Sequence, residues 1–363
     1  RYYLRYGVDL KEREEFTFSP VNFGVVLHAV IREVCDEIKK NGESYYLISE
    51  EKRREMVKRS VAAITDIYQN SILKDSSRNS FMIKRMEDLA DRTVWAMGEQ
   101  LKCGDFVPFV FEHKFNMEVG DGDRKQLMSG TIDRVDICEN GTDVYVRIID
   151  YKTGKKDFNI VKTYYGIDIQ LMVYMEAAMK LVAKMRPGKN VIPAGVFYYN
   201  ISDPIVSATT ESAEEIEDKI KGELRLKGMV NSDKDIAEKM DNTGGTSLNI
   251  PVSRKADGGF DSRRSKVMNT EQFNMLGRFV DVRAVDTADR IAGGDIRRSP
   301  YKDGQFSSCD RCPYGAVCGF SVDLPGCNYR KLKKFDDEVL WNNIKEGVDE
   351  NGKKMDTGAE ERD

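Results

Sequence analysis

Two aspartates and a lysine stand where a pair of neighbouring strands could end. Asp133 lies in Gly-Thr-Ile-Asp-Arg-Val-Asp, and Asp150 and Lys152 lie in Ile-Ile-Asp-Tyr-Lys-Thr-Gly. In antiparallel strands the two acids can come side by side, and the lysine, two residues after the second acid, shares its face. Adjacent carboxylates repel each other, and Mg²⁺, which prefers oxygen ligands, would compensate their charge. The lysine could then help to activate water or neutralise charge on a phosphate.

The alternative is that these charges only end two strands in water. Four further residues favour a site. Glu112 lies on the preceding expected strand, and His28 lies on the first expected helix as a neutral imidazole ligand. Gln170 and Tyr174 lie one turn apart on a later helix. Asp136, three residues after the first aspartate, faces the opposite way on a regular strand, so we expect it in a salt bridge.

Hydrophobic periodicity predicts the elements that would hold these residues. Three helices are expected first, over residues 21–41, 49–70 and 77–102. Three strands rich in β-branched and aromatic residues follow, at 106–115, 126–137 and 143–150. Turns are expected at 120–122 and at Asn140-Gly141, a strong hairpin signal. A helix over 158–185 and a strand over 191–200 complete the order helix, three strands, helix, strand, which predicts an α/β fold with a mixed sheet.

Beyond residue 200 the pattern is weaker. Helices are expected at 212–227 and 270–291, separated by a polar, glycine-rich stretch at 241–259. A docked, charged helix with a frayed tail is expected after residue 334. The chain therefore divides into a helical N-terminal part, a core, a helical insertion or extension, a cysteine-rich segment, and a charged C-terminal helix and tail: residues 1–105, 106–200, 201–295, 296–334 and 335–363.

Composition excludes several classes of protein. The net charge is −4, with 57 Lys and Arg against 61 Asp and Glu, so any nucleic-acid surface must be local. No apolar run is long enough to span a bilayer and no signal segment opens the chain, which predicts a cytoplasmic location. No Gly-x4-Gly-Lys-Ser/Thr sequence is present, so ATP hydrolysis is not expected. Because Arg1 opens within an amphipathic pattern, we expect the chain to be part of a longer protein.

Three closely spaced cysteines form a second candidate site. Cys309, Cys312 and Cys318 have the spacing Cys-x2-Cys-x5-Cys, which suits a zinc ion or an iron-sulfur cluster better than disulfides. Either centre needs a fourth ligand, and Cys327 is the nearest local candidate. The spacing leaves both centres open, and three free thiols are the remaining alternative.

The acidic and helical motifs resemble those of the RecB-type nucleases in the PD-(D/E)XK superfamily. The likeness covers most of the chain and rests on Gly24-x3-His28, Gly130-x2-Asp133-Arg134-x-Asp136, Asp150-Tyr151-Lys152-Thr153-Gly154 and Gln170-Leu171-x2-Tyr174. The opening Tyr-Leu-Arg-Tyr-Gly and the cysteine spacing are similar to the carboxy-terminal nuclease domain of the AddB subunits of bacterial AddAB helicase-nucleases.

The resemblance implies a restriction-endonuclease-like core of order αβββαβ and assigns a role to each motif. The implied Mg²⁺ ligands are His28, Asp133, Asp150 and the backbone carbonyl of Tyr151. Lys152 would assist hydrolysis, and Gln170 and Tyr174 would support the site or the DNA strand. Glu112 matches an acidic position of the family and is included among the catalytic candidates.

For the cysteines, the resemblance implies a [4Fe-4S] cluster bound by Cys309, Cys312 and Cys318. The implied fourth cysteine lies upstream of Arg1, so the cluster belongs to the longer protein and can be absent from this chain.

The implied function is Mg²⁺-dependent exonuclease action on single-stranded DNA ends, beside an AddA-type helicase-nuclease subunit. Such a complex processes double-strand ends for recombinational repair, and this subunit would degrade the 5′-ended strand. Lys155, Lys156 and Lys162 flank the expected catalytic strand and are candidates for contacts with DNA phosphates. The alternative is a catalytically silent DNA-binding or scaffold module, held together by a metal or iron-sulfur site.

Overall fold

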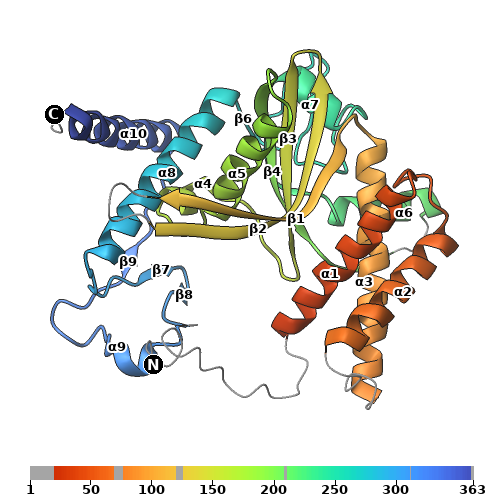
Figure 1. The fold of residues 1–363 in the computed structure, drawn as a ribbon, viewed down its shortest axis with the longest axis horizontal. Helices are drawn as coiled ribbons and strands as arrows, with labels where there is room; N and C mark the ends of the chain where they lie inside the picture. The colour runs from red at the N-terminus through yellow and green to blue at the C-terminus, as the bar shows by residue number, and fades with distance from the viewer. Residues whose placement is uncertain (1–19, 69–76, 120–125, 208–210, 311, 361–363) are drawn as a thin grey trace.

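The computed structural model describes residues 20–68, 77–119, 126–207, 211–310 and 312–360. A six-stranded mixed sheet lies at its centre, with the strands in sequence order (Figure 1). The strands are β1 (Val107–Val119), β2 (Gln126–Asn140), β3 (Asp143–Lys152), β4 (Asn190–Asn200), β5 (Lys227–Asn231) and β6 (Val267–Met268). β1, β2 and β3 form an antiparallel meander, and β4 lies parallel to β3. β5 is antiparallel to β4, and β6 is parallel to β5.

Helices cover both faces of this sheet. On one side lie α1 (Pro20–Lys40), α2 (Glu50–Tyr68) and α3 (Ser77–Lys102). On the other lie α5 (Gln170–Met185), α8 (Thr270–Ala292) and α10 (Asp337–Glu360). The predicted α/β class and the order helix, three strands, helix, strand are confirmed. The turn expected at 120–122 lies outside the described residues.

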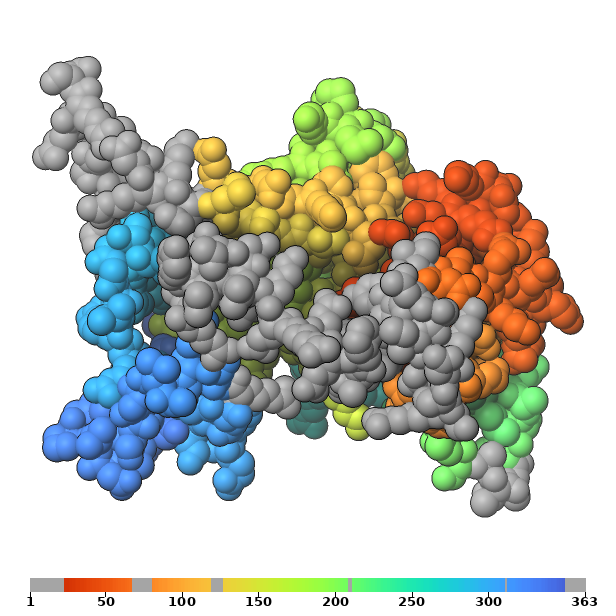
Figure 2. Space-filling view, turned by 60° about the horizontal axis from the view of Figure 1, so that its bottom comes forward, coloured from red at the N-terminus to blue at the C-terminus, as the bar shows by residue number. Residues whose placement is uncertain are grey.

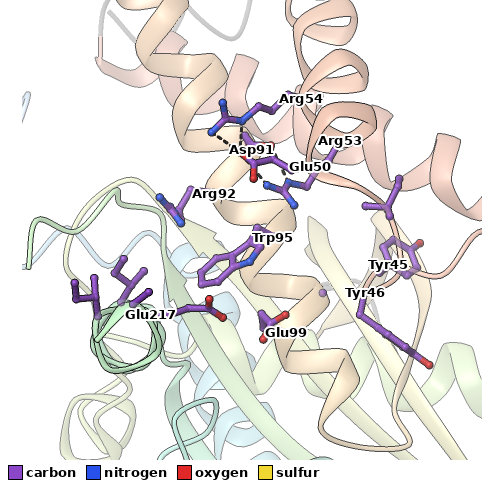
Figure 3. Close-up of a pocket in the computed structure, with 15 residues that line it drawn as sticks. Tyr45, Tyr46, Glu50, Arg53, Arg54, Asp91, Arg92, Trp95, Glu99 and Glu217 are labelled. Atoms are coloured by element: carbon purple, nitrogen blue, oxygen red, sulfur yellow. Dashed lines mark hydrogen bonds and ion pairs between the residues drawn. The ribbon is translucent and has the colours of Figure 1, made fainter. Parts of the chain in front are cut away.

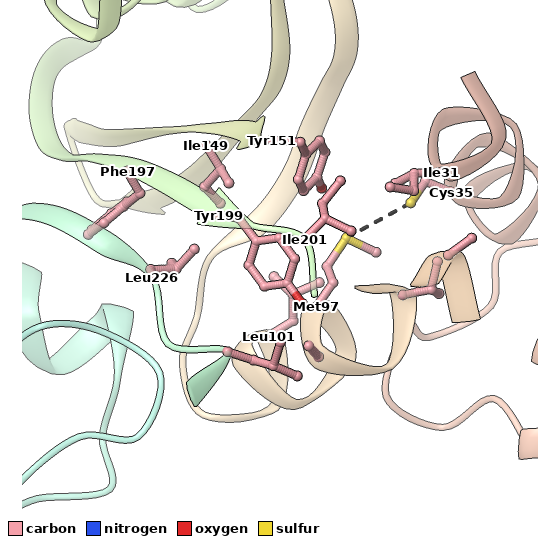
Figure 4. Packing of buried hydrophobic residues seen from close by; sticks show 14 of the residues in the cluster. Ile31, Cys35, Met97, Leu101, Ile149, Tyr151, Phe197, Tyr199, Ile201 and Leu226 are labelled. Carbon is pink, nitrogen blue, oxygen red and sulfur yellow. Dashed lines mark hydrogen bonds between the residues drawn. The ribbon is translucent and has the colours of Figure 1, made fainter. Parts of the chain in front are cut away.

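Alternation along the central strands produces the two buried layers. In β3, Val146 is buried in the core shared with α5 and α8, whereas Ile149 and Tyr151 are buried in the core shared with α1 and α3. Figure 4 shows the second core, in which the thiol of Cys35 on α1 lies 3.9 Å from the sulfur of Met97 on α3. Because both faces are covered, β3 reads as a nearly continuous apolar run.

The single helix expected over 158–185 is wrong. The structure has two helices here, α4 (Ile160–Tyr164) and α5, joined by a short loop. Gly166 adopts a left-handed conformation (φ 72), and its N–H bonds back to the Thr163 carbonyl, which ends α4. The break matters because the side chains of Asp168 and Gln170, after the loop, reach the ends of β4 and β3.

Residues 201–295 contribute strands as well as helices. α6 (Ala213–Glu223) and α7 (Lys234–Met240) flank β5, and β6 precedes α8. The two strands extend the main sheet, and the hydrophobic pattern did not predict them. The division of the chain into five segments stays a prediction.

The cysteine-bearing segment has a small sheet of its own, in the order β8-β7-β9. Its elements are β7 (Tyr301–Asp303), β8 (Phe306–Ser307), α9 (Gly315–Cys318) and β9 (Arg330–Lys331). In Figure 2 this segment, in blue, lies on the opposite side of the molecule from α1 to α3, in red and orange. Lys162 of α4 pairs with Asp303 at 2.9 Å, which ties the segment to the core.

The expected docked helix near the C-terminus is present. Leu340 and Ile344 of α10 are buried in the core shared with α5 and α8. The helix extends to Glu360, and the last three residues of the expected tail lie outside the described part of the chain. Within the described residues, no helix is both long and apolar enough to cross a membrane.

An acid pair between α5 and α8 predicts a pH-dependent stability. Burial, and then the charge of Glu176, raise the pKa of Asp281 to about 6. A carboxyl whose pKa is raised on folding stabilises the fold when protonated, and this contribution is lost as the pH rises through about 6. Asp281→Asn should therefore raise the melting temperature above pH 7, and its advantage should shrink below pH 6. Thermal unfolding between pH 5 and pH 8 measures this.

Asp286→Asn, on the exposed side of the same helix, is the matched control. The effect of Asp286→Asn on the melting temperature should be the same at pH 5 and at pH 8. An advantage of Asp281→Asn that does not change with pH would contradict the prediction.

Candidate active site

The candidate site lies where β2 and β3 separate. The last pair of their ladder is Arg134↔Ile149, and both strands continue, β2 beside β1 and β3 beside β4. Asp133 and Asp150 are the next residues on the two strands. We call this point, where β2 and β3 separate, the fork. The Asp133 carboxylate accepts a 2.6 Å hydrogen bond from the backbone N–H of Tyr151, so it links the strands beyond the end of the ladder.

Three side chains from α1, β1 and β2 converge beside the fork. Nδ1 of His28 lies 3.5 Å from Oδ2 of Asp133 and 3.8 Å from Oε1 of Glu112. One ligand atom from each lies within 4.8 Å of the others, and among the described residues this is the only such set of His, Cys, Asp or Glu. Carboxylate oxygens with one imidazole nitrogen can hold a divalent metal ion.

Asp150 is held from the α5 side of the sheet. Its Oδ1 accepts a 3.0 Å hydrogen bond from Nε2 of Gln170, and its Oδ2 lies 2.6 Å from Nζ of Lys152. Gln170 Nε2 also donates to the hydroxyl of Tyr174 at 3.0 Å. The residues expected from the sequence thus form two groups at the fork, with His28, Glu112 and Asp133 on one side and Asp150, Lys152, Gln170 and Tyr174 on the other.

The acids are crowded and largely removed from water. Burial, and then the charge of Asp133, raise the pKa of Asp150 to about 6, although Lys152 opposes the shift. The same two causes raise the pKa of Glu112. Burial opposes protonation of His28, but its contact with Asp133 and the nearby carboxylates outweigh it and raise its pKa. Burial is the larger cause for the two acids, and the charges of neighbouring carboxylates contribute to all three shifts.

The crowding of carboxylates at the fork fits a bound cation. Asp150 is only 2 % exposed, and its buried Oδ2 makes no hydrogen bond of normal geometry, although Lys152 lies at ion-pair distance. A divalent ion among these oxygens would relieve the repulsion and leave the His28 imidazole neutral, as a ligand requires. The donor set therefore suits a metal ion.

Glu112 has an unusual backbone. Its φ is 47°, and it is the only non-glycine residue with positive φ in the described chain. The β1–β2 ladder pairs Phe111 with Arg134 and His113 with Ile132, but it skips Glu112, which lies between them opposite Asp133. A left-handed residue in a strand is strained, and such strain is concentrated at functional sites. The strained position brings the Glu112 carboxylate within reach of His28.

Two substitutions at this position separate strain from charge. Glu112→Gly removes the Cβ that makes φ 47° unfavourable, whereas Glu112→Ala keeps it. Both remove the carboxylate, so we expect the glycine variant to be the more stable of the two by about 1 kcal/mol. Urea unfolding monitored by circular dichroism measures the difference. A glycine variant that is less stable than the alanine variant would contradict a strained backbone.

Aromatic side chains pack closely around the residues of the fork. The ring of Tyr151 contacts those of His28 and Tyr199, with centroids 5.8 and 5.9 Å apart. A Cβ on Gly130 would lie 2.8 Å from the ring of Phe115, which itself packs edge-on against Tyr174. Any larger residue at Gly130 would have to displace the Phe115 ring, which is a physical reason for glycine at this place in the sequence motif.

Asp136 makes the expected salt bridge, within the protein interior. Its carboxylate accepts two hydrogen bonds from Arg134, both 2.6 Å long, and one of 2.9 Å from Arg147. All three side chains are at most 1 % exposed. The group lies behind Asp133, on the side of the sheet that faces α1 and α3.

The structure adds two residues that the sequence did not indicate. The Tyr198 hydroxyl donates a 2.8 Å hydrogen bond to Asp168, and Lys156 pairs with the same carboxylate at 3.1 Å. The Lys156 ammonium lies 4.5 Å from the centre of the Tyr198 ring, and that of Lys152 lies 5.7 Å from it. Tyr198 was hidden in an apolar strand pattern, and Asp168 in the expected long helix.

The three lysines considered for DNA contacts differ in their surroundings. Lys155 is exposed, Lys156 is paired with Asp168, and Lys162 is paired with Asp303 of the cysteine-bearing segment. Lys156 therefore lies beside the fork, whereas Lys162 faces another part of the chain.

The cysteines are not gathered into a closed centre. All are free thiols, with Cys312 and Cys318 exposed, Cys309 half-buried and Cys327 buried. No three of these four sulfur atoms lie within 4.8 Å of one another. As placed, they do not form a four-cysteine site.

A groove of about 530 Å³ lies away from the fork, between α2, α3 and α6. Figure 3 shows Trp95 inside it, with the Arg92 guanidinium 5.1 Å from the centre of the Trp95 ring. Arg53 and Asp91 on its wall form a two-fold hydrogen-bonded pair. The groove contains none of the residues at the fork, so its size does not make it the candidate active site.

Comparison with known proteins identifies a family for this chain. Residues 1–319 match the model of the PD-(D/E)XK nuclease superfamily. Three proteins that are named as subunits of an ATP-dependent helicase/deoxyribonuclease are similar to the chain. That of Thermoanaerobacter sp. (strain X514) is 33% identical over 98% of the chain, that of Lachnoclostridium phytofermentans 33% over 99%, and that of Caldanaerobacter subterraneus subsp. tengcongensis 34% over 100%. The chain spans 32% of the length of each.

Proposed function

Because the chain belongs to the PD-(D/E)XK nuclease superfamily, we propose that it hydrolyses phosphodiester bonds of DNA as a Mg²⁺-dependent exonuclease. The observation that carries this proposal is the arrangement at one fork of His28, Glu112 and Asp133 on one side and of Asp150 with the ammonium of Lys152 on the other. A cationic side chain beside buried, mutually repelling carboxylates suits metal-assisted phosphoryl transfer.

His28, Asp133, Asp150 and the carbonyl of Tyr151 would hold the Mg²⁺ ion. When bound, the ion would polarise the scissile phosphate and stabilise the charge that develops on it. Glu112, which lies 3.8 Å from His28, would add a further carboxylate. The N–H of Tyr151 orients the Asp133 carboxylate.

The remaining residues would orient the groups at the site and neutralise negative charge there. Lys152 holds a positive charge 2.6 Å from Asp150 and would stabilise negative charge on the phosphate or orient the attacking water. Gln170 would fix Asp150 by its hydrogen bond, and it connects that carboxylate to the Tyr174 hydroxyl. Tyr174, half-buried at the start of α5, would complete the wall of the site.

The names of the relatives support a setting for this function. Those names describe subunits of ATP-dependent helicase-deoxyribonucleases. We propose that this chain acts in the cytoplasm, in such a complex with an AddA-type subunit, where it would receive single-stranded DNA and degrade the 5′-ended strand during the repair of double-strand breaks.

We further propose a [4Fe-4S] cluster in the longer protein, with Cys309, Cys312 and Cys318 as three of its ligands. What supports this proposal is the spacing Cys-x2-Cys-x5-Cys in a segment where Cys312 and Cys318 are exposed and Cys309 is half-buried. Anaerobic iron and sulfide analysis of a chain extended at its amino end tests the proposal. Zinc, or no metal, in that extended protein would overturn it.

The nuclease proposal is tested with linear single-stranded DNA labelled at either end. We expect degradation in Mg²⁺ and none in EDTA, with release of the 5′ label first if the proposed polarity is correct. A chain that binds this DNA but does not cleave it with Mg²⁺ would instead favour the silent DNA-binding or scaffold module.

A further inference from the structure

A row of basic side chains extends from the fork across the end of the main sheet. Lys152 ends β3, and its ammonium lies 5.7 Å from the centre of the ring of Tyr198, which is near the end of β4. Lys227, the first residue of β5, is paired with Tyr198 in the ladder, and Lys266 directly precedes β6. Neighbouring strands are about 4.8 Å apart, so the row covers about 15 Å.

Strand alternation directs these side chains to one face. Met229 and Met268 pack into the core shared with α5 and α8. Lys227 and Lys266 each lie two residues before one of these methionines, so they point to the same face as Asp150 and Lys152. One ion pair joins two parts of the row: Lys266 pairs with Asp157, which follows Lys156 in the chain.

Lys227 lacks a partner of opposite charge. It is half-buried, and among the described residues no carboxylate oxygen lies within 4.0 Å of its ammonium. Burial, and then the charge of Arg225, lower the pKa of Lys227; Glu223 and Asp157 oppose the shift, and Lys266 adds a smaller lowering. The Nε of Arg225 is likewise buried without a hydrogen-bond partner. Positive charge that is both crowded and partly desolvated is costly unless an anion completes it.

The carboxylates nearby do not compensate the charge of Lys227. Asp157 is paired with Lys266, and Asp168 with Lys156. Glu223 and Asp157 attract Lys227, but neither forms an ion pair with it. The anion that best fits a row of cations starting at a nuclease site is the repeating phosphate of the substrate strand.

We propose that Lys156, Arg225, Lys227 and Lys266 bind the phosphate backbone of single-stranded DNA and guide it along the ends of β4, β5 and β6 to Lys152. The proposal rests on the nuclease function proposed above and adds the path of the strand beyond the scissile phosphate. It assigns binding of DNA phosphates to Arg225, Lys227 and Lys266, which are far in sequence from the catalytic motifs.

The test compares Lys227→Gln/Lys266→Gln with the unmodified 363-residue chain. Binding of fluorescent oligothymidylates of 4 to 12 nucleotides is measured by anisotropy in EDTA, at several salt concentrations. Loss of two phosphate contacts should weaken binding of the longer oligonucleotides about tenfold and lower the slope of log affinity against log salt by about 1.4. The gain in affinity with oligonucleotide length should shrink in the variant.

Lys184→Gln/Lys189→Gln is the matched control, with the same loss of charge. Lys184 is exposed on α5, and Lys189 lies at the opposite end of the sheet, beside the β2–β3 turn. The control should bind like the unmodified chain. An equal loss in the control, or an unchanged salt slope in the Lys227 and Lys266 variant, would overturn the proposal.

Two further measurements separate binding from folding. Removing the crowded charge of Lys227 should leave the melting temperature unchanged or raise it, whereas a structural lysine would lower it. Lys227→Arg/Lys266→Arg keeps the charges and should restore the salt slope; a slope that stays low would count against phosphate binding. If the unmodified chain degrades DNA but the slope is insensitive to these lysines, only this path fails. If the unmodified chain neither binds nor degrades DNA, the nuclease function fails as well.

Discussion

Asp150→Asn is expected to reduce Mg²⁺-dependent degradation of linear DNA by about 10³-fold or more, while the fold is retained. The substitution keeps the shape of the side chain, and so the hydrogen bond to Gln170 can be kept with the amide oxygen. It removes the negative charge that would bind the metal ion and that pairs with Lys152. Initial rates on end-labelled single-stranded DNA measure the loss.

The stability of this variant is part of the prediction. The Asp150 carboxylate is 2 % exposed, and burial raises its pKa to about 6, so the charged form is costly to fold at neutral pH. A neutral amide avoids that cost, and Lys152, which is 27% exposed, can turn to water. We therefore expect a melting temperature in EDTA that is equal to or higher than that of the unmodified chain.

Asp143→Asn is the matched control, at the other end of the same strand. Asp143 accepts a hydrogen bond from Asn190 and lies at the β2–β3 turn, far along the strand from the fork. It should keep full activity. Undiminished degradation by Asp150→Asn would refute the assigned site, and a similar loss in Asp143→Asn would show that the assay reports general damage to β3.

Strong local patterns made much of this fold predictable. The helices α1 to α3 have clear amphipathic periodicity, and α3 begins and ends at the predicted residues. The Asn140-Gly141 signal marked the β2–β3 turn, in which Gly141 has φ 62°. The short spacings within the motifs also predicted which residues share a face, such as Asp150 and Lys152.

Other features depend on tertiary structure and left little local signal. β6 has two residues, and its partner β5 lies more than 30 residues away, so no periodicity could show the pairing. The break between α4 and α5 depends on Gly166, and a lone glycine in a helical pattern is often tolerated. The strain at Glu112 arises from the junction of β1 with the site rather than from the residue type.

A buried group of three charges lies directly behind the site and was only partly predictable. The sequence indicated a salt bridge for Asp136, but not that two arginines share it, nor that the group is closed to water. Arg147 comes from an apolar run of β3, and its guanidinium lies 4.8 Å from the centre of the Phe106 ring. Burial disfavours the Asp136 carboxylate, but the charges of Arg134 and Arg147 outweigh it and lower its pKa.

Asp136→Ala should therefore destabilise the chain by about 3 to 5 kcal/mol, the largest loss of stability that we expect from a single substitution. It would leave two arginines, each 1 % exposed, without the acid that compensates them. Because the pKa of Asp136 is lowered on folding, its stabilising effect is present above about pH 4 and is lost at lower pH. Urea unfolding at pH 7 measures the loss, which should be the same at pH 6 and pH 8.

Arg147→Met is the informative comparison, because it removes the surplus positive charge instead of the shared acid. Arg134 and Asp136 would remain as a pair with two hydrogen bonds, and one Arg147 nitrogen that is buried without a partner would be eliminated. We expect this variant to lose less than about 2 kcal/mol, since an apolar side chain of similar length can pack against Phe106. Equal losses in the two variants would mean that packing, rather than charge compensation, determines the stability of this interior. If Asp136→Ala is the more destabilising, the shared carboxylate is what keeps β2 and β3 aligned immediately before they separate at the site.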